Sequence, residues 1–279
     1  MMDKAPCIKR ICIYPVKALD GICLQKAQIG PGGSLQHDRE YAIIDENGKY
    51  VNGKKNPLVH LLRMNMNFEK NSIAFKQQQQ DNWHAFHLQN EKTAINNYLS
   101  AFFKKTVSLQ QNTLGGFLDI PVKSGMTLLS TASLQTVAGW FDNIPLDETR
   151  QRFRATLELD NVSAFWEDRL FAEEGTAIEF TIGDVKVLGM SPRARCVVPT
   201  RQPQTGESIH AFQKTFVNLR NQTLPAWSAL NQFEHAYYLS VDCLVPATET
   251  GKWVSIGDEV KLSGNKISAA TLQANNNYR

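Results

Sequence analysis

Short runs of hydrophobic residues alternate with turn residues over positions 7–68, a pattern typical of β-strands. The first run, residues 8–16, is rich in isoleucine and valine and predicts a strand that meets Pro15. Residues 41–51 predict a hairpin, because hydrophobic runs flank an Asn47-Gly48 pair that favours a tight bend. The N-terminal part of the chain is therefore expected to be β-rich.

Hydrophobic residues recur at helical spacing in two later segments. Residues 93–105 carry Ile95, Leu99 and Phe102 on one predicted helix face. Residues 130–140 predict a second helix, for which Ser130 can act as the N-terminal cap.

Two segments share an Ile-Gly-Asp pattern between hydrophobic runs. Residues 179–190 and residues 253–262 each predict two short strands around a Gly-Asp turn. A third segment, residues 151–159, predicts a strand whose alternation would place Arg152, Arg154 and Thr156 on one face.

Strands and turns outnumber helices, so we expect a β-rich α+β fold. The Gly115-Gly116 pair and Pro121 interrupt the pattern within residues 110–122. We therefore predict an N-terminal domain over residues 1–115, a larger domain over residues 116–265 and a polar tail over residues 266–279.

Composition narrows the possible functions. The 279 residues carry a formal net charge of +3 and are 42% hydrophobic, which suits a globular protein with a core. This charge is too small to predict a nucleic-acid partner, but it is compatible with an anionic small ligand. No hydrophobic run is long enough to predict a membrane span, and no membrane association is expected.

The cysteine pattern does not predict an extracellular disulfide framework. The five cysteines are odd in number and scattered, and a reducing, cytoplasmic location fits them better. No CxxC pair occurs, so neither a zinc ribbon nor an iron–sulfur cluster has a self-contained ligand set.

The segment from Ser191 to Gly206 contains the most informative cysteine. Arg193 and Arg195 flank Cys196, and two cations favour a thiolate over a thiol. A thiolate is the form needed for nucleophilic attack or for binding a soft transition metal. The residues alone leave a second interpretation open, in which Cys196 is an inert core residue beside surface arginines.

Several other cations are candidates for binding an anion. Lys17 follows the first predicted strand, and Arg39 can hold a phosphate or carboxylate through two parallel hydrogen bonds. The predicted face with Arg154 and Thr156 also suits an anion, although each of these groups could equally be solvated surface. We reject His37 and Asp38 as a catalytic dyad, since adjacent strand residues point to opposite faces.

Motifs of the common hydrolases and nucleotide-binding proteins are missing from the sequence. It contains no glycine-rich phosphate loop, no HExxH and no GxSxG.

The ordered segments resemble the MOSC family, which is named after the C-terminal domain of molybdenum cofactor sulfurase. The similarity is greatest to the group with an added N-terminal β-barrel, which includes the mitochondrial amidoxime reducing component and bacterial relatives. The segments that carry the resemblance are YPVK (14–17), HDREYAIIDENGKYV (37–51), LLSTASL (128–134), RFRATLEL (152–159), WED (166–168), IGDV (182–185), RCVVPTRQPQTGE (195–207) and VSIGDEVKL (254–262).

The resemblance implies two β-barrel units with a few helices and a molybdenum cofactor, molybdopterin, bound between them. It implies that Cys196 binds the metal and is the catalytic residue. The positions that would hold the rest of the cofactor are Lys17, Arg39, Ser124, Arg154, Thr156 and Arg195. Pyridoxal phosphate is not expected, because no lysine lies in a Schiff-base context.

For function, the resemblance implies an oxidoreductase that reduces N-hydroxylated small molecules. Some bacterial relatives carry a C-terminal ferredoxin domain that this sequence lacks, so we expect electrons from a separate donor protein of the ferredoxin, flavodoxin or cytochrome type.

The sequence departs from the family pattern at two positions, and these departures favour considering functions other than a reductase. Ala18 replaces the usual serine, and Thr156 replaces the asparagine of an FRPN segment. Each change can remove one cofactor hydrogen bond, worth about 0.5–1.5 kcal/mol. A cofactor or sulfur carrier without turnover is the alternative, and a β-barrel that has lost its ligand is a third.

Overall fold

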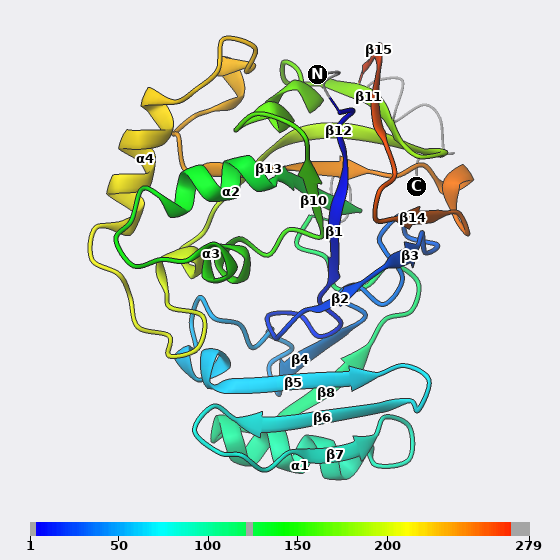
Figure 1. The fold of residues 1–279 in the computed structure, drawn as a ribbon. Helices are drawn as coiled ribbons and strands as arrows, with labels where there is room; N and C mark the ends of the chain where they lie inside the picture. The colour runs from blue at the N-terminus through cyan, green and yellow to red at the C-terminus, as the bar shows by residue number, and fades with distance from the viewer. Residues whose placement is uncertain (1–3, 121–124, 269–279) are drawn as a thin grey trace.

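The structure is a computed structural model that describes residues 4–120 and 125–268. Its largest element is an eight-stranded sheet with the strand order β15-β11-β12-β13-β9-β10-β1-β2. Figure 1 shows this sheet at one end of the molecule, with the helices α2, α3 and α4 beside it. The bounds of its strands in chain order are β1 Cys7–Ile13, β2 Ile22–Leu24, β9 Met126–Ser130, β10 Leu157–Asp160, β11 Thr176–Ile182, β12 Val185–Ala194, β13 Tyr238–Leu244 and β15 Val260–Ser268.

A smaller unit forms the other end of the molecule (Figure 1). It contains the three-stranded sheet β5-β6-β7, the β4-β8 pair and helix α1. The bounds of its elements are β4 Tyr41–Asp45, the 3-10 helix η1 Pro57–Leu61, β5 Leu62–Asn67, β6 Ser72–Gln77, β7 His84–His87, α1 Lys92–Phe103 and β8 Val107–Gln111.

The remaining elements connect and cover these sheets. Strand β3 pairs with β14, so residues near the two ends of the sequence lie side by side. The bounds are β3 Lys26–Gln28, α2 Thr131–Ala138, α3 Leu146–Phe153, α4 Phe212–Gln222, β14 Trp253–Ser255 and the 3-10 helices η2 Trp166–Leu170, η3 Val198–Thr200, η4 Leu230–Gln232 and η5 Ala247–Glu249. The expected β-rich α+β class is confirmed.

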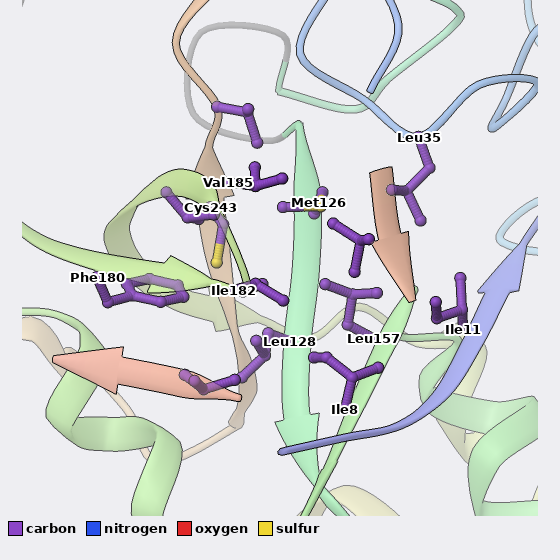
Figure 2. Close-up of a cluster of buried hydrophobic side chains, with 14 of the residues drawn as sticks. Ile8, Ile11, Leu35, Met126, Leu128, Leu157, Phe180, Ile182, Val185 and Cys243 are labelled. Atoms are coloured by element: carbon purple, nitrogen blue, oxygen red, sulfur yellow. The ribbon is translucent and has the colours of Figure 1, made fainter. Parts of the chain in front are cut away.

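Three hydrophobic clusters form the core. The largest joins strands from both ends of the sequence, and Figure 2 shows Ile8 and Ile11 packed with Leu128 and Leu157 in it. A second cluster lies within the smaller unit and contains Leu62, Phe75 and Leu99. A third packs α2 and α4 against strands β9 and β13.

The largest cluster explains why the first strands leave the smaller unit. Strand β1 pairs with β10, and β2 pairs with β1, so the first residues of the chain join a sheet whose other strands begin at Met126. The division between residues 115 and 116 stays a prediction. Strand β15 continues to Ser268, into the predicted tail, and residues 269–279 lie outside the described part.

Several predicted elements are confirmed. Helix α1 covers most of the segment predicted from hydrophobic spacing. Helix α2 begins after Ser130, whose hydroxyl accepts a hydrogen bond from the backbone of Ser133, as expected of a cap. The bend at Asn47-Gly48 is present, with Gly48 at a φ of 72°. Strands β11 and β12 form the first predicted Gly-Asp hairpin.

The second predicted Gly-Asp hairpin is wrong. Strand β14 pairs with β3, and strand β15 pairs with β11. The turn at Gly257-Asp258 is present, but its two flanking strands belong to different sheets. Local sequence predicts the bend, whereas the partner of each strand depends on distant residues.

The strand predicted for residues 151–159 is also wrong in its first half. Leu146–Phe153 is helix α3, Arg154 ends it in a left-handed conformation, and the strand β10 begins only at Leu157. Pro145 at the N-cap and Asp147 in the first turn were the available helix signals. Arg152, Arg154 and Thr156 therefore do not share one strand face.

The cysteines contain one bridge that their spacing did not suggest. Cys12 and Cys23 lie opposite each other on β1 and β2 and form a disulfide. Cys7, Cys196 and Cys243 are free. Within residues 4–120 and 125–268, no helix combines the length and the apolar character that crossing a bilayer requires.

Candidate functional site

A cavity of about 430 Å³ lies where the smaller unit meets the eight-stranded sheet. Residues 52–63 of the smaller unit form part of its lining, together with residues 150–158, which run from α3 into β10, and residues 193–203, which begin at the end of β12. Of the described residues, eleven lysines or arginines and only four carboxylates line it. Such an excess of cations, held in a concave site, suits a ligand with several negative charges.

Six of the predicted site residues meet in this cavity. Its lining contains Lys17, Arg39, Arg154, Thr156, Arg195 and Cys196. Ser124 lies outside the described residues, so its predicted role is not addressed by the structure.

Cys196 lies between the end of β12 and the 3-10 helix η3, and it is partly exposed. The sulfur is therefore not sealed in apolar packing, which was the open alternative in the sequence. The segment that follows is fixed by Arg152, a buried side chain of α3. Arg152 donates hydrogen bonds to the carbonyls of Pro199 and Arg201 at 2.8 and 2.7 Å, and it pairs with Glu148.

Arg195 places a half-buried cation beside Cys196. Its Nη2 donates to the carbonyl of Phe153 at 2.7 Å, while its buried Nε has no hydrogen-bond partner within the described residues. Burial and the neighbouring Arg193 lower the pKa of Arg195 to about 10. A buried donor without a partner is costly, and an anion in the cavity would remove that cost.

Arg39 and Arg154 are organised by one aromatic ring. The Tyr14 ring lies 4.7 Å from the Arg39 guanidinium and 4.1 Å from that of Arg154. Arg154 also donates to the carbonyl of Leu19 at 2.6 Å, and Arg39 is held by both oxygens of Asp38. Burial lowers the pKa of Arg154. Burial acts in the same direction on Arg39, but Asp38 outweighs it and the pKa of Arg39 is raised.

The backbone at these positions is unusual. Ala18, Arg39 and Arg154 have φ angles of 73°, 53° and 54°, in the left-handed region that non-glycine residues rarely adopt. All three line the cavity. Strained backbone of this kind often accompanies functional sites, where it aims side chains that regular structure could not.

Lys17 is paired with Asp119. Its Nζ donates to an Asp119 oxygen at 2.6 Å and to the carbonyl of Phe117 at 2.7 Å. Burial lowers the pKa of Lys17, although Asp119 opposes the shift. Arg193 contacts the same carboxylate at 3.2 Å. Asp119 thus balances two of the cavity's cations.

Thr156 is buried and uses its polar groups inside the sheet. Its hydroxyl donates to the carbonyl of Thr127 at 2.9 Å and accepts from the backbone of Thr127 at 2.8 Å. The single donor of the hydroxyl and one of its two acceptor lone pairs are thus used within the sheet, which leaves one lone pair for a ligand.

Sequence reasoning missed several lining residues. The sequence around Tyr14 does not indicate that its ring contacts Arg39 and Arg154, because the fold brings these residues together. His60 and Arg63 lie outside the segments that carry the resemblance, whereas Arg201 lies within the segment 195–207 but was not named as a site residue. His60 is buried, its Nε2 has no partner within the described residues, and burial followed by the charge of Arg201 lowers its pKa.

Comparison with known proteins gives a partial family match. Residues 5–113 match the model of the MOSC N-terminal beta barrel domain, so this part of the chain is similar to that domain. Within it lie Lys17 and Arg39, two of the cations that the resemblance assigned to cofactor binding.

Two relatives match the chain over short stretches only. A protein named Molybdenum cofactor sulfurase 3 from Aedes aegypti is 30% identical over 78 residues, which is 28% of this chain and 10% of that protein. Molybdenum cofactor sulfurase 1 from the same organism is 32% identical over 69 residues, or 25% of this chain and 9% of that protein. The chain thus spans about a tenth of the length of these relatives.

One solved structure aligns over most of the chain. The YUAD protein from Bacillus subtilis covers 92% of this chain and 94% of its own, with a TM-score of 0.36 and 11% sequence identity.

Proposed function

We propose that this protein binds a molybdenum cofactor in the cavity and reduces N-hydroxylated small molecules. The observation that carries the proposal is the gathering of Cys196 with Lys17, Arg39, Arg154 and Arg195 around one cavity. The match to the MOSC N-terminal beta barrel domain and the partial similarity to proteins named molybdenum cofactor sulfurases support the same ligand class.

The donor set fits such a cofactor. No group of three or more His, Cys, Asp or Glu side chains that could hold a metal ion occurs in residues 4–120 and 125–268. Cys196 lines the cavity and is partly exposed, and we assign it as the single soft protein ligand for the metal. A cofactor of this class also carries a phosphate, for which the arginine and lysine side chains supply planar and point-charge donors.

The bound cofactor would supply the two-electron chemistry of the reduction. The chain's own residues would bind and orient it. Arg39 and Arg154 would hold its anionic end, in positions kept by the Tyr14 ring. Arg195 would place its unpartnered Nε toward negative charge near Cys196, and Arg152 would keep the segment after Cys196 in place. Electrons would come from a separate donor protein of the ferredoxin, flavodoxin or cytochrome type.

Metal analysis tests the proposal. The full chain is expressed in a host that makes the cofactor, and molybdenum is measured in purified wild-type protein, in Cys196→Ala and in Cys243→Ala. We expect near-stoichiometric metal in the wild type and in the Cys243 control, and a severe loss in Cys196→Ala. Undiminished molybdenum and reductase activity in Cys196→Ala would show that the metal assignment is wrong.

A carrier without turnover is the second candidate. The two relatives that match short stretches of the chain are named as sulfurases, which favours this candidate. Cys196 is partly exposed and therefore reachable for sulfur transfer. Bound cofactor without reduction of hydroxylamines by a strong chemical reductant would favour the carrier over the enzyme. A persulfide on Cys196, detected by mass spectrometry, would indicate sulfur transfer.

A further inference from the structure

The bridge between Cys12 and Cys23 lies at an accessible edge of the fold. Strand β2 is the edge strand of the eight-stranded sheet, and only three residue pairs join it to β1. Cys12 is buried, with 7% of its surface exposed, whereas Cys23 is exposed. A thiol from solution can therefore reach the bridge from the side of Cys23, the exposed member of the pair.

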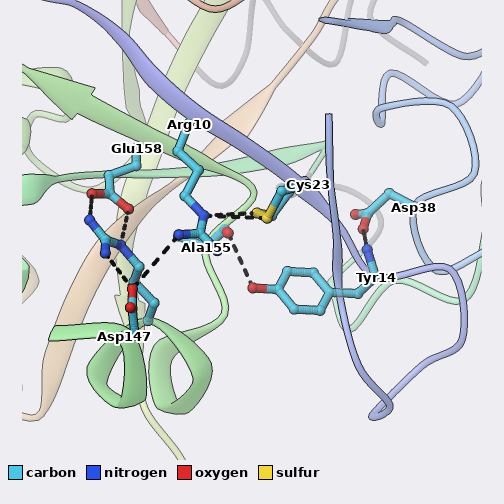
Figure 3. The surroundings of a disulfide bond; sticks show 9 residues. Arg10, Tyr14, Cys23, Asp38, Asp147, Ala155 and Glu158 are labelled. Carbon is cyan, nitrogen blue, oxygen red and sulfur yellow. Dashed lines mark hydrogen bonds and ion pairs between the residues drawn. A yellow bond between two sulfur atoms is a disulfide. The ribbon is translucent and has the colours of Figure 1, made fainter. Parts of the chain in front are cut away.

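A cation lies directly against both sulfurs. The Nε of Arg10 donates to Cys12 Sγ at 3.1 Å and to Cys23 Sγ at 3.3 Å, and Figure 3 shows this side chain directed at the bridge. A guanidinium in this position stabilises a thiolate, and a stabilised thiolate is a better leaving group in thiol–disulfide exchange. A bridge that only held two strands together would gain nothing from such a neighbour.

The bridge also belongs to the wall of the cavity. Arg10, Cys12 and Cys23 line it together with Cys196. The disulfide closes the loop between β1 and β2, and this loop carries Lys17. A change in the bridge would therefore alter a wall that presents a cation to the cavity.

We propose that Cys12 and Cys23 form a thiol–disulfide exchange site whose reductant is a dithiol. A thiolate of the dithiol attacks Cys23 Sγ, the bond between the two sulfurs breaks, and Cys12 leaves as a thiolate that Arg10 stabilises. The second thiol of the reductant then attacks the reductant sulfur that is bonded to Cys23, and Cys23 is released as a thiolate. The pair gains two electrons and two protons, and the dithiol becomes a disulfide.

The test uses the folded full chain and dithiothreitol as the dithiol. The protein is equilibrated with graded ratios of reduced and oxidised dithiothreitol, free thiols are trapped with a maleimide, and labelled peptides are identified by mass spectrometry. We expect Cys12 and Cys23 to become labelled together in one two-electron transition while circular dichroism stays native. Protein that is reoxidised before the maleimide is added should no longer be labelled at either cysteine. Cys12→Ser and Cys23→Ser should each lack the transition.

Replacing Arg10 tests whether the disulfide is an exchange site or only a structural bridge. Arg10→Gln should slow reduction by roughly tenfold, the size of one lost charge-assisted hydrogen bond. Lys9→Gln is the matched control, because Lys9 carries the same charge on the same strand but pairs with Asp160. The proposal is overturned if the bridge resists dithiothreitol until the protein unfolds, if both cysteines are free thiols that no oxidant joins, or if the two variants react at equal rates. The exchange proposal does not depend on the cofactor, so it can fail while the proposed function holds.

Discussion

At the scale of single residues, several residues that line the cavity have backbone conformations that the sequence does not predict. Ala18 is the clearest case, because an alanine occupies the left-handed region at a φ of 73°. Its side chain contributes no polar group, so nothing in its chemistry compensates the backbone cost. Relieving that cost is a direct test of whether the conformation is imposed by the surrounding fold.

Ala18→Gly should raise the free energy of unfolding by about 0.5–1 kcal/mol, since glycine adopts positive φ without a steric penalty. Urea denaturation of the two proteins measures the difference. Ala101→Gly is the control of opposite sign. Ala101 is exposed within α1, where glycine should lower stability by about 1 kcal/mol. An unchanged or lowered stability of Ala18→Gly would contradict the assigned strain.

Burial of the Glu167 carboxylate should lower the stability of the fold, and this effect can be measured. Glu167 is 1% exposed, and neither carboxylate oxygen has a well-formed hydrogen bond within the described residues. Burial raises the pKa of Glu167, an effect that the nearby Ser133 hydroxyl opposes. The folded state therefore favours the protonated carboxyl, and its contribution to stability is present below the ordinary pKa of 4.5 and lost as pH rises through the folded-state pKa.

Glu167→Gln should consequently be more stable than the wild type at pH 7, by about 1–3 kcal/mol, and should lose this advantage below pH 4.5. Denaturation curves across that range provide the measurement. Glu174→Gln, at an exposed position, should match the wild type throughout. A glutamine variant that is less stable at neutral pH would mean that the carboxylate has a compensating partner.

At the scale of elements, helix α3 supports the segment that carries Cys196. Its last three residues were predicted as the start of a strand, and the helix changes what Arg152 can do. From a helix, Arg152 pairs with Glu148 four residues earlier and reaches the carbonyls of Pro199 and Arg201. The arginine thus holds the neighbouring 3-10 helix η3 and the residue after it through their carbonyls.

Arg152→Met should lower the free energy of unfolding by about 3 kcal/mol, because it leaves buried carbonyls and Glu148 without their partner. Amide hydrogen exchange should rise selectively over residues 197–201. Arg169→Met serves as the control, since Arg169 is exposed and stacks on Trp227. Equal exchange in both variants would show that Arg152 does not hold this segment.

At the scale of the whole molecule, the cavity exists because the smaller unit packs against the large sheet. Arg63 of the smaller unit donates to the carbonyl of Pro203 at 3.5 Å and pairs with Asp20. The resulting excess of cations is offset in part by Asp119, which contacts Lys17 and Arg193. An anionic ligand must compete with this carboxylate for both.

Asp119→Asn should therefore bind inorganic pyrophosphate more tightly, by roughly fivefold at low ionic strength, and the gain should shrink as salt is added. Isothermal titration calorimetry on both proteins measures it. Asp142→Asn removes an exposed carboxylate elsewhere and should leave affinity unchanged. Weaker binding in Asp119→Asn would assign Asp119 a supporting role in anion binding.

Local sequence was sufficient where neighbouring residues decide the structure. The spacing of Ile95, Leu99 and Phe102 predicted α1, Ser130 predicted the cap of α2, and Asn47-Gly48 predicted the bend after β4. These features depend on backbone preference and on hydrogen bonds within a few residues. The family resemblance then named six residues that the fold brings to one cavity, although their functional roles remain predictions.

Tertiary structure alone decided which distant segments meet. It paired β3 with β14 and β11 with β15, where local pattern favoured a hairpin, because strand partners are selected by burial across the whole sheet. It also joined Cys12 to Cys23, which spacing along the chain did not indicate. The arginines of the cavity are held by carbonyls and one tyrosine ring far away in sequence, and only packing can supply such partners.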